Sequence, residues 1–506
     1  MTLKYNPHLG GMPPESCMAF LSQVFLLAFL PAAVLTHWLA PLRVRNAVLA
    51  LSGLVLLGWA GPLLVLPLLA VAIVDWACGR AMAAPIPLGA AALEPGGPRT
   101  RRQKLAFALS LATNLGLLAG FKLVPPLLGW LAGLTGWSWT PCSGWQVAVP
   151  LGLSFYTFQS LSHTIDVYRG HTPPCRRFVD YLAYLAAFPR LTAGPIVRFH
   201  EISERLASRR FELDRLGRGC LLFCFGLGKK VLLANPLGSA ADAAFAAASP
   251  AAADAWLGLL AFSFQIYFDF SGYTDMALGL GLMVGLELPP NFDAPYRSAS
   301  VTEFWRRWHM TLSFWLRDYV FLPVAYASGR RLARWGAAPR REEMLSYAAA
   351  AVTTMLLCGL WHGVTWGFVV WGGLHGVWLV LERLVMRKRW YRVAPRPVLV
   401  GATFAFLTVS WVFFRAGSLG AAGRYLGCML GFGGAENSVL VRGLLVTPAQ
   451  LGALAAAVAL AWLAVPSQRV AATLTPARVG LAVAVLWLSL AVLSAQAHTG
   501  FLYAVF

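Results

Sequence analysis

Long apolar runs, separated by short polar stretches, recur along the whole chain of 506 residues. They cover roughly residues 18–40, 47–77, 105–132, 147–164, 219–239, 255–286, 345–381, 398–414, 450–465 and 478–497. A helix needs about 20 apolar residues to cross a bilayer. The composition agrees, because 58% of the residues are hydrophobic and only 12% are charged. We therefore predict an all-α, polytopic integral membrane protein with about 10–13 transmembrane or re-entrant helices.

The apolar runs leave no hydrophilic stretch long enough to fold separately, so we predict a single transmembrane domain over residues 1–506. Residues 1–17 are polar and rich in Pro and Gly, so we expect an N-terminal extension ahead of the first apolar run, with Met18 as an alternative start. The run at residues 47–77 can form two short helices divided near Gly61-Pro62. We find no internal repeat, which argues against a transporter.

The net charge of +20 comes from basic stretches that lie between the apolar runs. The clearest are Arg99 to Lys104, Ser328 to Arg341 and Arg383 to Arg392. Basic residues gather in this way in cytoplasmic loops, where they also contact anionic lipids. We therefore expect membrane lipid, and not nucleic acid, as the partner of these charges.

The eight cysteines follow no metal-binding pattern. Cys220 and Cys224 lie one helical turn apart, but no second pair completes a site and no CxxC pair occurs. We expect neither a disulfide framework nor a bound metal.

Three segments are too polar or too irregular for plain membrane spans. They are Val149 to Gly170, Phe188 to Phe199 and Leu288 to Val324. Polar or irregular backbone is tolerated at membrane depth only against protein or a wet cavity. These segments therefore predict a polar chamber inside a helical shell.

Three of the nine histidines stand out as candidates for chemistry: His309, His362 and His375. An ionisable group inside a membrane is a functional candidate by default. His362 is flanked by Gly359 and Gly363, which would allow a substrate to approach closely. On one continuous helix His375 would face nearly the opposite way, unless Gly372-Gly373 bends that helix. We therefore expect His362 to be reactive and His375 to have a packing or supporting role.

A histidine of this kind fits several chemistries. It can act as the general base that activates a hydroxyl group for acyl transfer. A proton relay would use intramembrane carboxylates, and Asp269 and Asp275 are candidates. A metal site lacks ligand spacing such as HExxH, and neither a GxSxG elbow nor a Walker motif is present. Acyl transfer and transport therefore both remain open from the residues alone.

Three motifs resemble the signatures of the membrane-bound O-acyltransferase superfamily. They are FDFSGYTDMALGLGLMVG (residues 268–285), PNFDAPYRSASVTEFWRRWHMTLSFWLRDYVFLPV (290–324) and GLWHGVTWGFVVWGGLHG (359–376). With FPRLTAGPIVR, FGLGKKVLLA and WVFFRAGSL, the resemblance covers much of residues 149–418 and is closest to the bacterial branch that O-acetylates alginate and peptidoglycan.

This resemblance implies a multi-helix shell around a central tunnel, with His362 as the catalytic histidine and His309 as the second histidine of the family. His309 would bind the donor carbonyl or stabilise its developing charge. The implied donor is acetyl-CoA or another acyl thioester, with no cofactor. Residues that would line the tunnel or bind the donor are Arg306, Arg307, Arg317, Asp275, Trp361 and His375.

The resemblance also implies a setting in the bacterial inner membrane. The acetyl group would pass to a periplasmic SGNH-type acetyltransferase or an acyl-carrying partner, and through it to a polysaccharide, with an alginate-like polymer favoured. Peptidoglycan, cellulose or teichoic acid would require the same chemistry. A channel or exporter for such a polymer is the alternative of a different class.

The last residues, 495–506, end in TGFLYAVF. This ending is similar to the Phe-x-Tyr-x-x-Phe terminus of the small partner peptide in teichoic-acid D-alanylation. That similarity implies that Tyr503 receives the acyl group and passes it on. The alternative is that the aromatic residues only anchor the last helix at the membrane interface.

Overall fold

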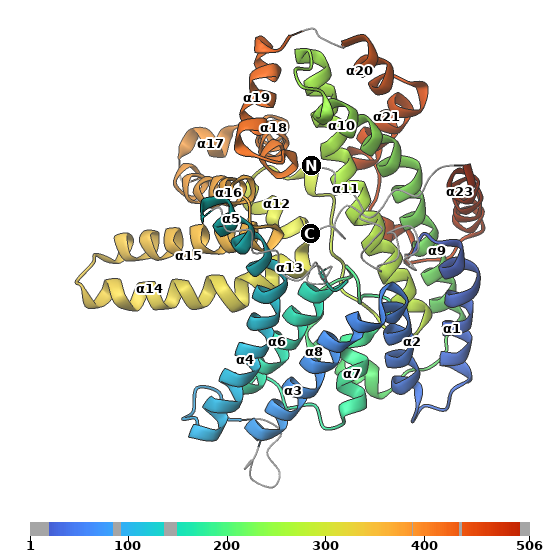
Figure 1. Ribbon diagram of the computed structural model, residues 1–506, viewed down its shortest axis with the longest axis vertical. Coiled ribbons are helices and arrows are strands. Elements are labelled where there is room, and N and C mark those ends of the chain that lie inside the picture. Colours follow the sequence, from blue (N-terminus) through green and yellow to red (C-terminus); the bar gives the residue numbers. More distant parts are fainter. Residues whose placement is uncertain (1–19, 84–92, 136–148, 387, 435–437, 496–506) are drawn as a thin grey trace.

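The computed structural model of the chain describes residues 20–83, 93–135, 149–386, 388–434 and 438–495. Regular structure within these ranges is entirely helical (Figure 1). The α-helices are α1 (Leu30–Leu39), α2 (Arg45–Ala60), α3 (Val65–Ala83), α4 (Arg101–Lys122), α5 (Val124–Thr135), α6 (Leu153–Arg169), α7 (Phe178–Ala186), α8 (Phe199–Ala207), α9 (Leu213–Gly228), α10 (Asn235–Ala246), α11 (Ala252–Met283), α12 (Val301–Arg307), α13 (Met310–Leu316), α14 (Leu322–Arg334), α15 (Pro339–His362), α16 (Trp366–Val385), α17 (Arg389–Val393), α18 (Arg396–Arg415), α19 (Leu419–Gly427), α20 (Ser438–Leu445), α21 (Pro448–Trp462), α22 (Ser467–Val470) and α23 (Pro476–Ala495).

Seven helices in the described part of the chain are long and apolar enough to cross a membrane. They are Pro62–Ala83, Arg101–Lys122, Leu213–Ala246, Pro339–His362, Trp366–Val385, Arg396–Arg415 and Pro476–Ala495. Phe25–Leu39, Arg45–Ala60 and Pro448–Trp462 are shorter apolar helices. The predicted all-α, polytopic membrane architecture is confirmed.

Two of the longest apolar runs each form two helices instead of one. The run at residues 47–77 is divided at Gly61-Pro62, as predicted, because α2 ends at Ala60. The run at residues 345–381 is divided between His362 and Trp366, where α15 ends and α16 begins. The two histidines of this run therefore lie on different helices, and the helix at Gly372-Gly373 continues.

Helices α15 and α16 pack so closely that their backbones are in contact. A Cβ atom added at Gly372 would lie 2.3 Å from the Met355 carbonyl oxygen, and one added at Gly359 would lie 2.3 Å from the Phe368 carbonyl oxygen. Only glycine fits at such distances, so these residues set how closely the two helices pack. The C-terminal end of α15 is thereby fixed against the start of α16.

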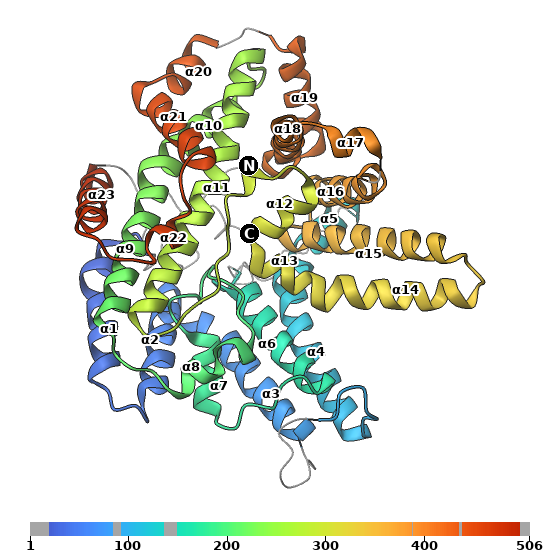
Figure 2. The same cartoon turned by 180° about the vertical axis from the view of Figure 1, so that it is seen from behind.

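The short helices α12 and α13 lie near the middle of the molecule in both views, with α11 on one side and α15 and α16 on the other (Figures 1 and 2). α12 packs directly against α16. His309 stands at the junction of the two short helices, as the residue that precedes α13. The fold therefore brings the ends of α12, α13 and α15 toward one region.

Candidate active site

His362 is the last residue of α15 and is 5% exposed. The next residue, Gly363, has extended backbone and caps the helix by donating its N–H to the Gly359 carbonyl at 3.2 Å. Aromatic rings surround the imidazole, with centroids 4.6 Å (Trp361), 5.0 Å (Phe414), 5.4 Å (Trp371) and 6.1 Å (Phe368) away. The imidazole therefore lies at a helix end inside an aromatic pocket.

His309 adopts a left-handed backbone conformation, with φ of 42°. Asn, Asp and His are the side-chain-bearing residues that tolerate this region best. Its ring is 1% exposed and meets the edge of Phe270 at 4.7 Å between centroids. The unusual backbone turns the chain between α12 and α13, so that the imidazole lies buried at the centre of the molecule.

Asn291 determines which ring nitrogen of His309 carries the proton. Its side-chain oxygen accepts the backbone N–H of Thr311 at 3.2 Å and the Thr311 hydroxyl at 2.9 Å. A backbone N–H can only donate, so the oxygen of this amide, and not its nitrogen, faces His309. Nδ1 of His309 lies 3.1 Å from the same oxygen and must therefore donate to it.

This bond leaves the lone pair of neutral His309 on Nε2. Nε2 is buried and has no hydrogen-bond partner among the described residues. Nε2 of His309 is thus a buried acceptor, and Asn291 holds the ring in one tautomer. Neutral His309 cannot donate from Nε2, so the predicted role of binding a carbonyl oxygen does not suit this tautomer.

Trp361 and Lys122 connect the two histidines. The Trp361 ring lies 6.3 Å from the His309 ring and 4.6 Å from the His362 ring. Lys122, the last residue of α4, donates from Nζ to the Trp361 carbonyl at 2.9 Å and lies 5.2 Å from the Trp361 ring centroid. The site thus combines two imidazoles and an ammonium group around one indole.

His375 is fully buried, and each of its ring nitrogens has a partner. Nδ1 accepts from the Trp305 indole N–H at 3.3 Å. Nε2 therefore carries the proton and donates to the Ser410 hydroxyl at 3.1 Å, which in turn donates to the Leu407 carbonyl at 2.7 Å. His375 thus joins α12, α16 and α18 instead of facing a substrate.

The predicted donor-binding arginines differ in their surroundings. Arg307 pairs with Glu303 at 2.9 Å and with Asp293 at 3.6 Å. Arg317 bonds Asp318 at 2.6 Å and is exposed. Arg306 is exposed, with no ion pair among the described residues. Of the three, Arg306 is the one whose charge is not already balanced by a carboxylate in the described structure.

The two predicted relay carboxylates on α11 are both ion-paired. Asp275 accepts from Lys229 at 2.6 Å and from Gln468 at 2.5 Å. Asp269 pairs with Lys230 at 2.5 Å. Both lysines lie in a π-helical turn that follows α9, so these pairs hold α9 against α11. Asp275 serves that contact, and the structure does not place it in the histidine cluster.

Sequence reasoning did not single out Lys122 or Asn291. Lys122 had a visible signal, since it is the only charged residue in the apolar run at residues 105–132. Asn291 had none, because its meaning depends on a contact across 18 positions of sequence. Tyr503 and the rest of residues 496–506 lie outside the described residues, as do residues 1–17. Within the described part, no group of three or more His, Cys, Asp or Glu residues could hold a metal ion.

Comparisons with known proteins identify the family of the chain. A model of the membrane-bound O-acyltransferase family matches residues 130–414, which include both histidines. The chain is 39% identical over 420 residues to the probable alginate O-acetylase AlgI of Azotobacter vinelandii, covering 82% of this chain and 79% of that one. It is 38% identical over 441 residues to the probable alginate O-acetylase AlgI of Pseudomonas aeruginosa, covering 86% and 79%.

A relative named for another polymer, peptidoglycan, matches a smaller share of the chain than the alginate O-acetylases do. The chain is 32% identical over 365 residues to the peptidoglycan O-acetyltransferase of Helicobacter pylori, covering 66% of each chain. The family resemblance of the motifs is thereby confirmed. The chain belongs to the membrane-bound O-acyltransferase family and is a multi-pass membrane O-acetyltransferase.

Proposed function

We propose that this enzyme takes an acetyl group from a cytoplasmic thioester, acetyl-CoA or a similar donor, and moves it across the bacterial inner membrane. The group then serves to O-acetylate an extracytoplasmic polysaccharide of the alginate type, through a periplasmic SGNH-type acetyltransferase or another acyl-carrying partner. Relatives named as alginate O-acetylases over more than four fifths of this chain support the polymer. The buried pairing of His362 with a tautomer-fixed His309 around Trp361 carries the chemistry.

The reaction joins a hydroxyl oxygen to the thioester carbonyl carbon. His362 removes the hydroxyl proton as the oxygen attacks, the carbon–sulfur bond breaks, and the departing thiolate receives that proton. The aromatic rings around His362 exclude water, which would otherwise hydrolyse the thioester. His362 therefore acts as base in one half of the step and as acid in the other.

Lys122 and His309 support this step in different ways. The Lys122 ammonium lies beside Trp361, whose ring is 4.6 Å from that of His362, so it supplies positive charge where the carbonyl oxygen and the thiolate become negative. His309 offers a lone pair at Nε2, which accepts an N–H or O–H group of a bound substrate. This assignment gives the acceptor role to His309 and the electrostatic role to Lys122.

Transfer of radiolabel from acetyl-CoA to the purified protein and its partner tests the proposal. His362→Ala should lower the transfer rate by roughly 100-fold or more, because the general base is lost. Lys122→Met, which keeps the apolar stem, should lower the rate by about tenfold. His200→Ala is the matched control, since this histidine lies half-exposed on α8. Near-normal transfer by a well-folded His362→Ala enzyme would contradict the proposal.

A further inference from the structure

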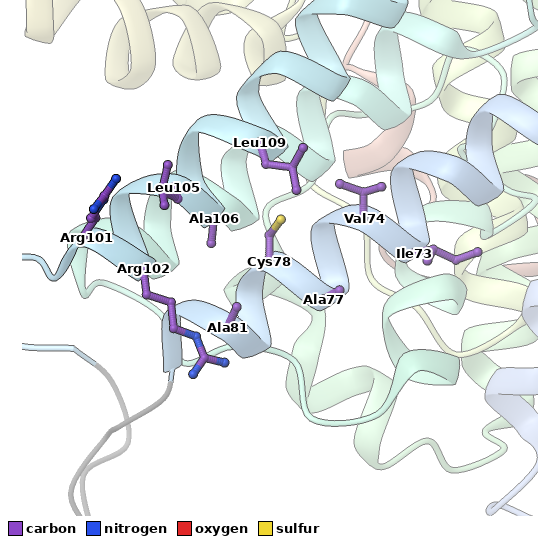
Figure 3. A pocket seen from close by; sticks show the side chains of 10 residues that line it. All are labelled: Ile73, Val74, Ala77, Cys78, Ala81, Arg101, Arg102, Leu105, Ala106 and Leu109. Carbon is purple, nitrogen blue, oxygen red and sulfur yellow. The ribbon is translucent and has the colours of Figure 1, made fainter.

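A groove runs between α3 and α4, apart from the histidine site, and has a volume of about 700 Å³ (Figure 3). Apolar side chains line most of it, and two arginines of α4 stand at one end (Figure 3). The lining residues are Ile73, Val74, Ala77, Cys78, Ala81, Arg101, Arg102, Leu105, Ala106 and Leu109. The alanines leave the space between the two helices unfilled.

This groove faces the bilayer. α4 is the least buried of the seven candidate spans, with 11% of its apolar window buried inside the protein. Leu105 and Leu109 are exposed on its outer face. Water does not reach such a surface in a membrane, so the groove must be filled by hydrocarbon. An acyl chain of a membrane lipid is the occupant that the bilayer supplies.

The positive charges at one end of the groove favour binding of an anion. Arg101, Arg102 and Lys104 are exposed in the first turns of α4 and have no ion pair among the described residues. A helix N-terminus carries partial positive charge, so cations are unfavourable there, and no acidic residue offsets them in the first turn. The segment that joins the helices, residues 84–100, contains one acidic residue, Glu94, which forms no ion pair with Arg101 or Arg102 in the described structure.

Neighbouring Arg99 has a structural role and differs in this from Arg101 and Arg102. Its guanidinium donates to the carbonyl oxygens of Tyr168 at 2.7 Å, Gly97 at 2.8 Å and Glu94 at 2.9 Å. Arg101 and Arg102 make no such bonds within the described structure, and Figure 3 shows them at the start of α4, at one end of the lining residues. Their donors are therefore available to a ligand.

We propose that the α3–α4 groove binds one anionic phospholipid, with an acyl chain along Ala77 and Ala81 and the headgroup phosphate at Arg101 and Arg102. Arginine binds phosphate through paired N–H groups, and basic residues near a membrane surface attract anionic lipid headgroups. The opposite end of α4 is Lys122 at the histidine site. A lipid bound here would hold α4 against α3 and so steady Lys122.

Native mass spectrometry of the delipidated full chain in detergent tests the site. The wild-type protein should retain phosphatidylglycerol in preference to phosphatidylcholine. R101Q/R102Q should weaken phosphatidylglycerol retention by roughly 10- to 30-fold, as expected for two lost phosphate contacts. R340Q/R341Q is the matched control, because these exposed arginines also begin a helix but are followed by Glu342 and Glu343.

A second pair of variants tests the groove itself. A77F should reduce phosphatidylglycerol retention with both arginines intact, whereas A112F, at an exposed position of α4 outside the groove, should not. Inorganic phosphate should not displace the lipid. Equal retention of the two lipids by the wild type would overturn the proposal, and so would unchanged retention in A77F. The readout is binding, so it stands independently of the proposed reaction.

Discussion

The hydrogen bond between His309 and Asn291 fixes which nitrogen of a buried imidazole donates and which accepts. Thr311 donates twice to the Asn291 oxygen, and the same oxygen accepts the His309 Nδ1 proton. Thr311 is itself fixed, because its hydroxyl accepts the Ile196 backbone N–H at 3.1 Å. The tautomer of His309 is thus imposed by a chain of contacts that starts outside the site. Asn291 is a positioning residue that acts through His309.

Replacing Asn291 tests whether the tautomer of His309 matters, because the imidazole itself stays in place. Asn291→Leu removes the acceptor, so His309 can place its proton on either nitrogen, and we expect at least about tenfold slower acetyl transfer. Asn291→Asp keeps an acceptor oxygen toward both His309 and Thr311, and should preserve most of the rate. Radiolabelled acetyl transfer, measured with thermal unfolding of each variant, checks this. Equal losses in both variants, at equal stability, would contradict the tautomer argument.

At the scale of helices, the turn after α15 decides the surroundings of His362. α15 ends at His362 and α16 begins at Trp366, so the imidazole lies at a helix end and not on a helix face. Gly359 and Gly372 let the two helices touch backbone to backbone. The aromatic pocket then forms from residues of α15, α16 and α18. The spacing of the two helices and the surroundings of His362 therefore depend on the same glycines.

The adjacent glycines of α16 offer a matched test of this spacing. Gly372→Ala places a Cβ atom 2.3 Å from the Met355 carbonyl oxygen, so α15 and α16 must separate. We expect a loss of roughly 1–3 kcal/mol of stability, seen as a lower unfolding temperature, together with slower acetyl transfer. Gly373→Ala meets only the Leu356 side chain at 3.7 Å and should be neutral or slightly stabilising. Similar effects of the two changes would refute the close-packing argument.

How far the sequence predicts these elements depends on the range of the interaction involved. The division at Gly61-Pro62 was predictable, since proline and glycine break helices locally. The division after His362 was not, because a Gly-Gly pair is the stronger helix breaker in the sequence, although Gly372 and Gly373 are both helical and Gly372 is used for close packing. His362 could be found from its own flanks. The contacts of His309 with Asn291 and of Lys122 with Trp361 exist only in the folded chain.

At the scale of the whole molecule, the proposed reaction requires the acetyl group to travel between compartments while the histidines stay fixed. α15 alone has 24 residues, about 36 Å of helix, with the basic stretch of residues 328–341 at one end and His362 at the other. The resemblance of the chain's ending to an acyl-accepting terminus suggests a carrier for that transfer. The hydroxyl that attacks the thioester would then belong to Tyr503.

Tyr503→Phe tests that carrier by removing a single oxygen atom. The phenyl ring keeps any anchoring role at the membrane interface, whereas the group that forms the acyl ester is lost. We expect polymer acetylation to cease while insertion and yield stay normal, measured as acetyl content of the polymer in cells. Acetylation at the wild-type level would show that Tyr503 is only an anchor. Phe501→Leu is a suitable control for lost aromatic area.

The left-handed backbone at position 309 limits how this enzyme can diversify. At φ of 42° most L-residues cost about 1 kcal/mol or more, and only Gly, Asn, Asp and His are readily accommodated. Glycine offers no functional group, and aspartate would place a charge beside a buried amide oxygen. The backbone conformation therefore leaves about two residue types that are both tolerated and functionally useful at this position, histidine and asparagine. A new reaction that needs lysine, serine or cysteine here would first require a different loop between α12 and α13.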